Sequence, residues 1–486
     1  MQQSAKSQRE FTSFVKREAI DLPDFGLVEV KEPNLHKDIF PWSLAPVMPI
    51  DGVTLPIDVQ DNLEITDTTF RDGQQAREPY TTEQMVKLYG WLRELGGPKA
   101  RISMSEFFIY SKRDVDAVKQ CLTMGGAPKV TAWIRAAKQD VKLFAETSKA
   151  VEKETGLPLD ETGILTSISD YHIFYKYGNK GRKEVVDGYV ELVEEVLKAG
   201  FSCRCHLEDS TRSDVFGVVV PFVRRLMKLA EKHSKRVVIR YPDTVGVGVP
   251  WDVAALPRSI PKLTYVLKTV AGVPPAWLEF HGHQDLNYGV ANATSAWLYG
   301  AGRNNCTLLG IGERAGNIPL EDMVFAYAGI KGSFDGMDTR VITKIAEYYE
   351  RELGHLNPEF APITGKNFAV TRAGIHADGV LKNIEMYLPF DTEKLLDVPA
   401  GVAITSYSGT SGIAFWMNAH YRLKGGHKLG KDDPRVQSLY ADAMKVFDEG
   451  RTTPLTDREM EDLVQRHVPD VAGGRGPMAS GAMARG

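Results

Sequence analysis

The chain has 486 residues, of which 43% are hydrophobic and 25% are charged, and its formal net charge at pH 7 is −4. These values are typical of a folded globular protein and exclude a disordered or fibrous chain. The balance of 59 basic and 63 acidic residues lacks the excess positive charge that is typical of nucleic-acid binding. With no long apolar run, no signal peptide and only four cysteines, the sequence predicts a cytoplasmic protein without a membrane-spanning helix.

The first 60 residues are rich in proline in their second half and are expected to form an N-terminal extension. From about residue 62, short runs rich in Val, Ile, Thr and Phe alternate with longer stretches of helical periodicity. Eight such runs predict strands, near residues 62–67, 101–107, 129–135, 162–168, 202–208, 236–241, 277–283 and 306–310. Eight strand–helix units favour an α/β fold of the (β/α)8 TIM-barrel type over the alternative, an open doubly wound sheet.

Helical patterns fill the intervals between the strands, for example at 82–95, 184–199, 214–233 and 288–301. After about residue 336 the alternation stops, and helices are expected at 338–353, 411–423 and 434–448 around a loop-rich stretch. The resulting domain prediction is an N-terminal extension at 1–60, a TIM-barrel catalytic domain at 61–335, mostly helical C-terminal subdomains at 336–470 and a flexible tail at 471–486.

Polar residues gather at the predicted C-terminal ends of the strands, where a TIM barrel carries its chemistry. The first strand runs into DTTFRDGQQ (67–75), and the seventh ends in His281 and His283. Residues i and i+2 of a strand share a face, so both imidazoles can join the Asp72 carboxylate in binding a divalent metal. Asn317, after the eighth strand, can add a neutral oxygen ligand. A His-x-His pair on its own is also compatible with a purely structural role.

Alternation along 202–208 places Arg204, His206 and Glu208 on one face of their strand. If that face is the barrel interior, Cys203 and Cys205 pack outward against helices, which argues against a Cys-x-Cys metal site.

Three segments resemble motifs of the metal-dependent DRE-type TIM-barrel family of Claisen-type acyltransferases and lyases. They are DTTFRDGQQ (67–75), HGHQD (281–285) and GIGERAGN (310–317), in the same order and at the same strand ends. A fourth, RAGIHADGVLKNIEMY (372–387), is similar to a segment that follows the barrel in the synthases of this family.

The resemblance implies that a metal polarises the ketone of an oxo acid, which the enolate of acetyl-CoA then attacks. Arg71, beside Asp72, can stabilise the developing negative charge, although an ion pair at the barrel rim is an alternative role. The resemblance also assigns catalytic roles to Gln75, Glu208 and Glu313, and contacts with the oxo acid to Ser169, His172 and Thr244. For Ser169 a structural helix cap is an equal alternative.

Cationic residues near the strand ends indicate which oxo acid is bound. An arginine without a partner in an apolar pocket would be costly, so Arg135, Arg204 and Arg240, with His172 and His206 nearby, favour an acceptor with a second carboxylate. Oxaloacetate and 2-oxoglutarate both meet this condition.

His376 and Tyr387 resemble a His and a Tyr of the post-barrel region that reach the active site of the partner subunit. The resemblance therefore predicts a homodimer with a swapped C-terminal segment that acts as an active-site lid. The two residues are candidates for proton transfer.

Further stretches, including SEFFIYS, TSISDYHIFYK and RCHLEDSTR, look most like the Re-face citrate synthases of this family. That subgroup implies oxaloacetate and acetyl-CoA as substrates, with Mn2+ or Co2+ as the metal and Mg2+ or Zn2+ as alternatives. Homocitrate synthase and isopropylmalate synthase are rival activities of the same type. An acyl-CoA lyase and a non-catalytic barrel are rivals of a different class.

Overall fold

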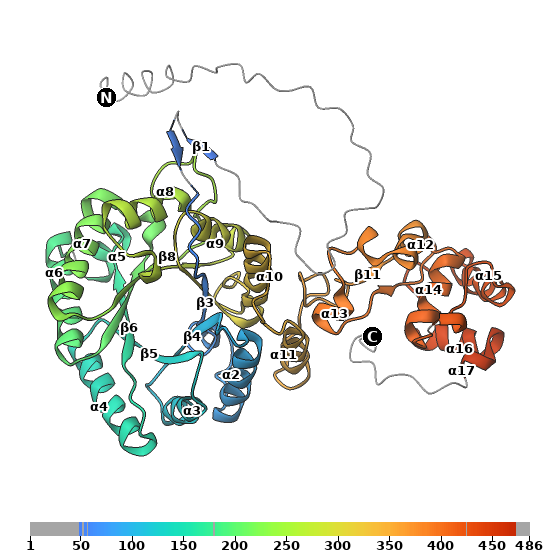
Figure 1. Ribbon diagram of the computed structural model, residues 1–486, viewed down its shortest axis with the longest axis horizontal. Coiled ribbons are helices and arrows are strands. Elements are labelled where there is room, and N and C mark those ends of the chain that lie inside the picture. The colour runs from blue at the N-terminus through green and yellow to red at the C-terminus, as the bar shows by residue number, and fades with distance from the viewer. Residues whose placement is uncertain (1–47, 51–52, 56, 178–179, 424, 473–486) are drawn as a thin grey trace. The chain divides into compact units, whose positions relative to one another are not determined.

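The computed structural model describes residues 48–50, 53–55, 57–177, 180–423 and 425–472. These residues fall into two compact units, one that ends at Met337 and one that begins at Asp338 (Figure 1). Most of the predicted extension at 1–60 and nearly all of the predicted tail at 471–486 lie outside the described residues. The boundary proposed between barrel and C-terminal subdomains, at 335/336, falls close to the division between the two units.

The first unit is a closed barrel of eight parallel strands, which confirms the predicted (β/α)8 fold over the open sheet (Figure 1). Its strands pair in the order β10-β3-β4-β5-β6-β7-β8-β9. They are β3 (Glu64–Asp67), β4 (Ile102–Phe107), β5 (Lys129–Arg135), β6 (Glu161–Ser167), β7 (Ser202–Glu208), β8 (Val237–Asp243), β9 (Leu278–Gly282) and β10 (Arg303–Cys306). A separate short hairpin, β1 (Met48–Ile50) and β2 (Val53–Leu55), precedes the barrel.

The eighth strand was predicted at 306–310, and this position is wrong. The strand is β10, and Leu308–Gly310 forms a 3-10 turn with Leu309 at φ 54°. Asn304 and Asn305 make β10 look unlike a strand, because asparagine is depleted in sheets. Both amides are buried, and their NH2 groups donate hydrogen bonds here, Asn304 to the carbonyl of Ala293 and Asn305 to Thr66, which lowers the cost of burying them.

Helices surround the strands: α2 (Thr82–Gly96), α3 (Lys112–Thr123), α4 (Lys138–Thr155), α5 (Asp170–Lys176), α6 (Arg182–Lys198), α7 (Val220–His233), α8 (Ile260–Tyr265), α9 (Gly289–Leu298) and α10 (Leu320–Lys331). Thr81 caps α2 through a reciprocal pair of hydrogen bonds with Gln84. The single helix predicted at 214–233 is instead a short π-helix at Val215–Val219 followed by α7. Pro221 explains the change, because it has no N–H to continue a preceding α-helical ladder.

The second unit consists mainly of helices, with two short strands that pair in parallel. Its elements are α11 (Arg340–Arg351), β11 (Val370–Thr371), α12 (Gly374–Lys382), α13 (Thr392–Leu396), β12 (Gly401–Val402), α14 (Thr410–His420), α15 (Pro434–Asp448), α16 (Asp457–His467) and α17 (Pro469–Ala472). An apolar core forms between α14, α15 and α16 from residues such as Ile413, Met417, Leu439, Met460 and Val464.

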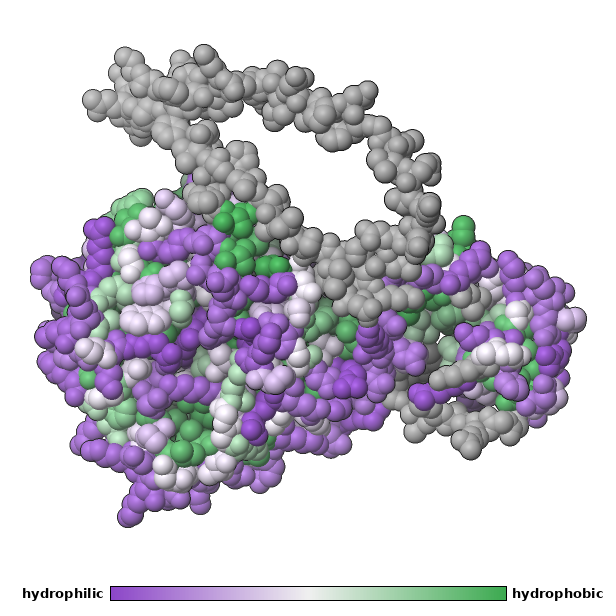
Figure 2. All heavy atoms as spheres, in the orientation of Figure 1, coloured by the Kyte–Doolittle hydropathy of each residue, from purple (hydrophilic) through white to green (hydrophobic). Residues whose placement is uncertain are grey.

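Hydrophilic residues cover much of the visible barrel surface, with smaller hydrophobic patches between them (Figure 2). In the part of the chain that the structure describes, no helix has the length and apolar character needed to cross a membrane. The apolar side chains of the barrel pack chiefly between strands and helices, whereas several charged residues are fully buried. Those charges organise the site described next.

Candidate active site

Three side chains converge at the C-terminal end of the barrel in a geometry suited to a metal ion. Asp72 follows β3, and His281 and His283 lie at the end of β9; one ligand atom from each lies within 4.8 Å of the others. The two Nε2 atoms are 3.2 Å apart, and Oδ2 of Asp72 is 3.4 Å from the first and 3.9 Å from the second. One carboxylate and two imidazoles, all buried, are a ligand set that several divalent ions accept.

The charge states of these groups also suit a metal. Burial and the neighbouring His281 lower the pKa of His283 to about 4, so its imidazole is neutral at pH 7. Burial opposes ionisation of Asp72, but the charge of Arg71 and the contacts with His281 and His283 together outweigh it and hold the pKa of that carboxyl well below its usual range. The cluster therefore offers neutral nitrogen and anionic oxygen, the forms in which both groups ligate metals.

Asn317 joins the cluster through its amide, whose Nδ2 donates to Oδ2 of Asp72 at 2.6 Å. Its Oδ1 is buried and has no hydrogen-bond partner among the described residues. Gly312 makes room for this amide, because a Cβ at that position would lie 1.9 Å from Oδ1. Since the two ends of an asparagine amide are assigned from their partners, a rotated amide would present oxygen to the cluster.

Arg71 lies directly beside the cluster and is held on both sides. Its NH1 is 2.6 Å from Asp72 Oδ1, and its Nε donates to Glu106 Oε2 at 3.0 Å. The guanidinium also lies 5.4 Å from the ring centre of Trp133. Arg71 thus forms the ion pair that was considered as its alternative role. The same ion pair keeps the guanidinium next to the metal cluster.

Glu106, on β4, is a central residue that the sequence did not reveal. Its Oε2 accepts from Arg71 and from NH1 of Arg240, each at 3.0 Å, and its Oε1 lies 3.3 Å from His206 Nε2. Gly163 permits this packing, because a Cβ there would lie 2.7 Å from His206 Nε2. The sequence did contain one signal. Side chains along a barrel strand point alternately into the lumen and toward the helices, so this alternation could have identified Glu106 as a residue of the lumen.

The predicted partners of Arg204 and Arg240 require correction. Both side chains are fully buried and already paired: Arg204 with Glu161 at 2.9 Å and with Glu279 at 2.7 Å, and Arg240 with Glu279 at 3.1 Å and with Glu106. The argument that an unpartnered arginine requires a substrate carboxylate is therefore wrong for Arg204. NH1 of Arg204 and NH2 of Arg240 each lack a hydrogen-bond partner among the described residues.

These pairs form a continuous series of alternating charges through the barrel, which we call the lumen ladder. It begins with Arg236 on Glu161 at the N-terminal end of the strands and ends with Arg71 on Asp72 at the metal cluster. In order, its members are Arg236, Glu161, Arg204, Glu279, Arg240, Glu106, Arg71 and Asp72. Positive and negative side chains compensate one another at every step.

Arg135 also differs from its prediction. It ends β5, but its side chain is 62% exposed and pairs with Asp140 of α4 at 2.8 Å. The buried carboxylate of Asp140 thus holds this arginine at the rim. Gln75 and Glu313 are exposed on the loops that follow β3 and β10.

A second group of polar residues surrounds Glu208 at the end of β7. Its Oε2 lies 3.3 Å from His172 Nδ1 and 3.3 Å from Lys176 Nζ, and it also accepts from Ser167. Ser169 caps α5 by accepting from the N–H of His172, which is the structural alternative considered for it. Lys176 is a contact that the motifs did not indicate, because it lies one turn beyond His172 on α5.

Thr244 and the post-barrel pair complete the predicted set. Thr244 Oγ1 accepts from the N–H of Asp209 at 2.8 Å, which leaves its own proton to donate. His376 and Tyr387 belong to the second unit, where their rings lie 4.2 Å apart. His376 is exposed and Tyr387 is 40% exposed.

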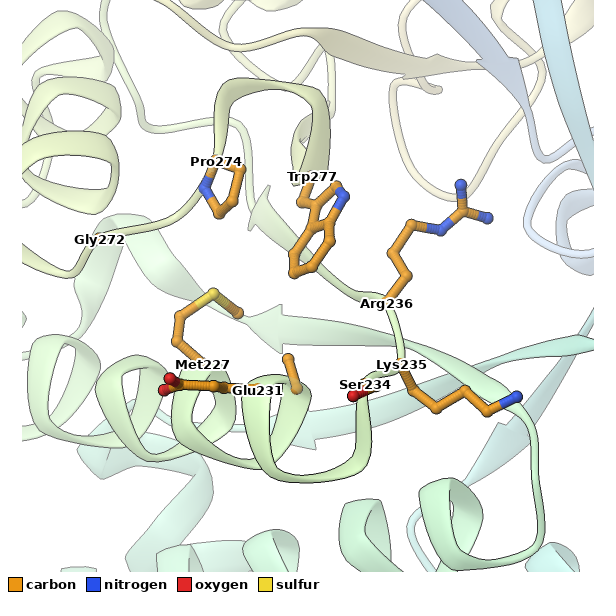
Figure 3. A pocket seen from close by; sticks show the side chains of 9 residues that line it. Met227, Glu231, Ser234, Lys235, Arg236, Gly272, Pro274 and Trp277 are labelled. Carbon is orange, nitrogen blue, oxygen red and sulfur yellow. The ribbon is translucent and has the colours of Figure 1, made fainter.

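A separate cavity of about 330 Å³ opens near the N-terminal ends of β8 and β9 (Figure 3). Residues from the end of α7 and from the segments that precede β8 and β9 line it, including Met227, Glu231, Pro274 and Trp277. The Arg236 side chain points away from Met227 and Pro274 and pairs with Glu161. None of the predicted site residues lines this cavity.

Comparison with known proteins shows the family of the chain. The HMGL-like family matches residues 62–348. The chain is 45% identical over 449 residues to "Citrate (Re)-synthase" of Clostridium kluyveri, covering 92% of this chain and 97% of that protein. It is 44% identical to the protein of the same name from Syntrophus aciditrophicus, covering 92% and 70%. It is 35% identical to "2-phosphinomethylmalate synthase" of Streptomyces hygroscopicus, covering 90% and 97%.

The chain therefore belongs to the HMGL-like family, and within that family it is similar over nearly its whole length to proteins named citrate (Re)-synthase.

Proposed function

We propose that this protein is an acyltransferase of the citrate (Re)-synthase type, which joins acetyl-CoA to oxaloacetate and releases citrate and CoA. The observation that carries the proposal is 45% identity to the Clostridium kluyveri citrate (Re)-synthase over 92% of the chain. The cluster of Asp72, His281 and His283 beside Arg71 supports it, because the chemistry needs a Lewis acid and a cation at one place.

Asp72, His281 and His283, with Asn317 beside them, are the residues that would hold the metal. A divalent ion bound there supplies Lewis-acid polarisation of the oxo acid's ketone. We favour Mn2+ or Co2+, since imidazole with carboxylate suits both, as it also suits Zn2+ and, less well, Mg2+.

Arg71 supports the reaction as a fixed hydrogen-bond donor. Glu106 holds its Nε and Asp72 holds its NH1, so the guanidinium cannot turn away from the cluster. We propose that it donates to the ketone oxygen as negative charge develops there. Because both contacts exist before substrate binds, little reorganisation is required during the reaction.

Glu208 and His172 are the proposed acid–base pair. They lie 3.3 Å apart, so a proton taken from the methyl group of acetyl-CoA by one can be shared with the other. The resulting enolate carbon attacks the ketone carbon, whose oxygen gains the proton. Water then adds to the thioester; its OH remains on the new carboxyl group and its H leaves with the CoA sulfur.

The oxo acid has further candidate contacts at the same end of the barrel. Thr244 can donate its hydroxyl proton to a carboxylate. NH2 of Arg240 lacks a partner among the described residues, and NH1 of the same side chain lies 3.5 Å from His206 Nδ1. Gln75 and Glu313 lie on loops at this end, where each can contact substrate. Thiol release in the presence of Mn2+ tests the proposal, with oxaloacetate, 2-oxoglutarate, 2-oxoisovalerate and pyruvate assayed separately.

Chelator-sensitive turnover confined to oxaloacetate is the expected result of that assay. Preference for 2-oxoglutarate would make the protein a homocitrate synthase, and preference for 2-oxoisovalerate would make it an isopropylmalate synthase. Cleavage of an acyl-CoA without condensation would indicate a lyase. No turnover by folded, metal-loaded protein would favour a non-catalytic barrel.

We also propose a homodimer in which His376 and Tyr387 serve the active site of the partner subunit, as the family resemblance implies. Sedimentation should then give twice the monomer mass of 53.9 kDa. Mixing an inactive His376→Ala variant with an inactive His283→Ala variant should restore part of the activity, since some mixed dimers contain one intact site. Absence of restored activity in proven mixed dimers would contradict the swap.

A further inference from the structure

The location of one proton decides whether His281 can bind a metal. A neutral imidazole carries a proton on one ring nitrogen and a lone pair on the other. Nε2 of His281 faces His283 Nε2 at 3.2 Å and Asp72 at 3.4 Å, so this nitrogen must carry the lone pair if it is to act as a ligand. Its Nδ1 lies 2.8 Å from Asn305 Oδ1 on the neighbouring strand β10.

The orientation of the Asn305 amide therefore sets the tautomer, and Thr66 sets that orientation. Asn305 Nδ2 lies 3.0 Å from the Thr66 hydroxyl oxygen. That hydroxyl has one proton to give and two acceptors around it, a carboxylate oxygen of Glu279 and the carbonyl of Asn304 at 3.3 Å. With its proton directed to either acceptor, the hydroxyl oxygen can only accept from Asn305.

Glu279 gives the arrangement its direction. Its Oε2 is paired with Arg204 at 2.7 Å and with Arg240 at 3.1 Å, and the Thr66 hydroxyl donates to its other oxygen, Oε1. If the Asn305 amide were flipped, its Oδ1 would face Thr66, and the Thr66 hydroxyl would donate to Oδ1 of Asn305. The fully buried Glu279 carboxylate would then lose its hydrogen bond from Thr66. Since hydrogen bonds to ionised acceptors are about twice as strong as neutral ones, the observed orientation is favoured.

We propose that Glu279, Thr66 and Asn305 form a directional hydrogen-bond chain that holds His281 in its Nδ1–H tautomer and so prepares Nε2 to bind a divalent metal. The chain links the lumen ladder to the metal cluster through a second route, separate from Glu106 and Arg71. The three are positioning residues, because they act through His281. The inference rests on the proposed metal-dependent function only in taking the ligand to be a divalent ion.

A direct test reads the tautomer in the unaltered protein and uses one variant only to assign the signal. Long-range 1H–15N spectra of the metal-free full-length protein, labelled at histidine nitrogens, distinguish the two tautomers; loss of one signal set in His281→Gln assigns it. We expect a protonated Nδ1 and an unprotonated Nε2 at His281. A proton on Nε2 would overturn the proposal, whatever the protein's activity.

A second test measures the affinity for Mn2+ alone, from the electron paramagnetic resonance signal of the free ion and without substrates. Thr66→Val removes the hydroxyl but keeps the shape, and it should weaken binding about tenfold, as is common for partners of metal ligands. Thr66→Ser should restore affinity because it keeps the hydroxyl. Thr162→Val is the matched control, since Thr162 is equally buried on β6 and bonds only to backbone carbonyls.

An unchanged Mn2+ affinity in folded Thr66→Val, or an equal loss in Thr162→Val, would overturn the proposed chain. Both tests leave substrates out, so a wrong assignment of the oxo acid affects neither. If Thr66→Val does not fold, the tautomer of the unaltered protein still decides.

Discussion

The two units of this protein fill their interiors in opposite ways. The centre of the barrel holds the lumen ladder, in which Arg204, Arg240, Glu106, Glu161 and Glu279 are all fully buried. The centre of the second unit is apolar, packed from aliphatic and methionine side chains of α14, α15 and α16. Charges impose fixed partners and distances, whereas apolar packing mainly requires that volume be filled. The barrel interior is therefore specific, and the second core is tolerant.

The largest expected effect concerns the charged end of the barrel. His283→Ala removes one ligand from the cluster, so Mn2+ uptake should be lost and turnover should fall at least about a thousandfold, or about 4 kcal/mol of barrier. His233→Ala, which alters a histidine paired with Glu194 on the barrel exterior, should leave both unchanged. Normal Mn2+ uptake by His283→Ala would exclude this residue as a ligand.

Glu161→Leu tests how specific the ladder is. The change leaves Arg204 with Glu279 as its one carboxylate partner and removes the ion pair of Arg236 with Glu161. It should therefore lower the free energy of unfolding by about 3–5 kcal/mol. Adding Arg204→Met removes the uncompensated charge and should recover much of the loss. Hydrogen exchange followed by mass spectrometry measures each unit separately. Equal losses in the single and double variants would mean that cavity formation, not charge, is responsible.

His206 links barrel stability to pH. Burial, then the charge of Arg240, lowers its pKa to about 3, whereas an unfolded histidine titrates near 6.5. Between these values the unfolded chain binds more protons, so stability rises with pH up to about 6.5 and is lost as pH falls. The unaltered protein should lose up to about 1.4 kcal/mol per pH unit more than His206→Gln in this window. If denaturation at each pH showed the same change of stability with pH in both proteins, this assignment to His206 would be contradicted.

Met417→Leu should have the smallest effect. Met417 is fully buried in the apolar core of the second unit, and the swap conserves volume. A cost below about 1.5 kcal/mol is expected, confined to hydrogen exchange of the second unit. A loss as large as that of Glu161→Leu would erase the contrast between the two interiors.

Sequence reasoning succeeded where local pattern and function coincide. The strand period placed His281 and His283 on one face, and the segment after the first predicted strand supplied Asp72 at the end of a different strand of the same barrel. It also placed Arg204 and His206 toward the lumen. It failed on their partners, because Glu161 and Glu279 lie on other strands, 43 and 75 residues away from Arg204, and meet it only through the register of the closed barrel. Glu279 shared a visible signal, since it precedes His281 by two residues on the same face.

Other features depend on contacts that no local pattern contains. The position of β10 was predicted wrongly because its asparagines are stabilised by hydrogen bonds to Ala293 and Thr66, which belong to different elements. Lys176 approaches Glu208 only because α5 is folded over the end of β7. The roles of Gln75, Glu313, His376 and Tyr387 are predictions, and mixing the His376→Ala and His283→Ala variants tests that of His376.

The alternating charges of the barrel also constrain how this protein can diverge. A single substitution in the lumen ladder leaves the charge of a neighbouring side chain uncompensated. Evolution without loss of stability therefore requires two nearly simultaneous substitutions, one at a basic and one at an acidic residue. Drift at these positions should thus be slow and should proceed in pairs. A descendant that uses a different oxo acid would more easily arise by substitutions in the rim loops than by substitutions in the lumen.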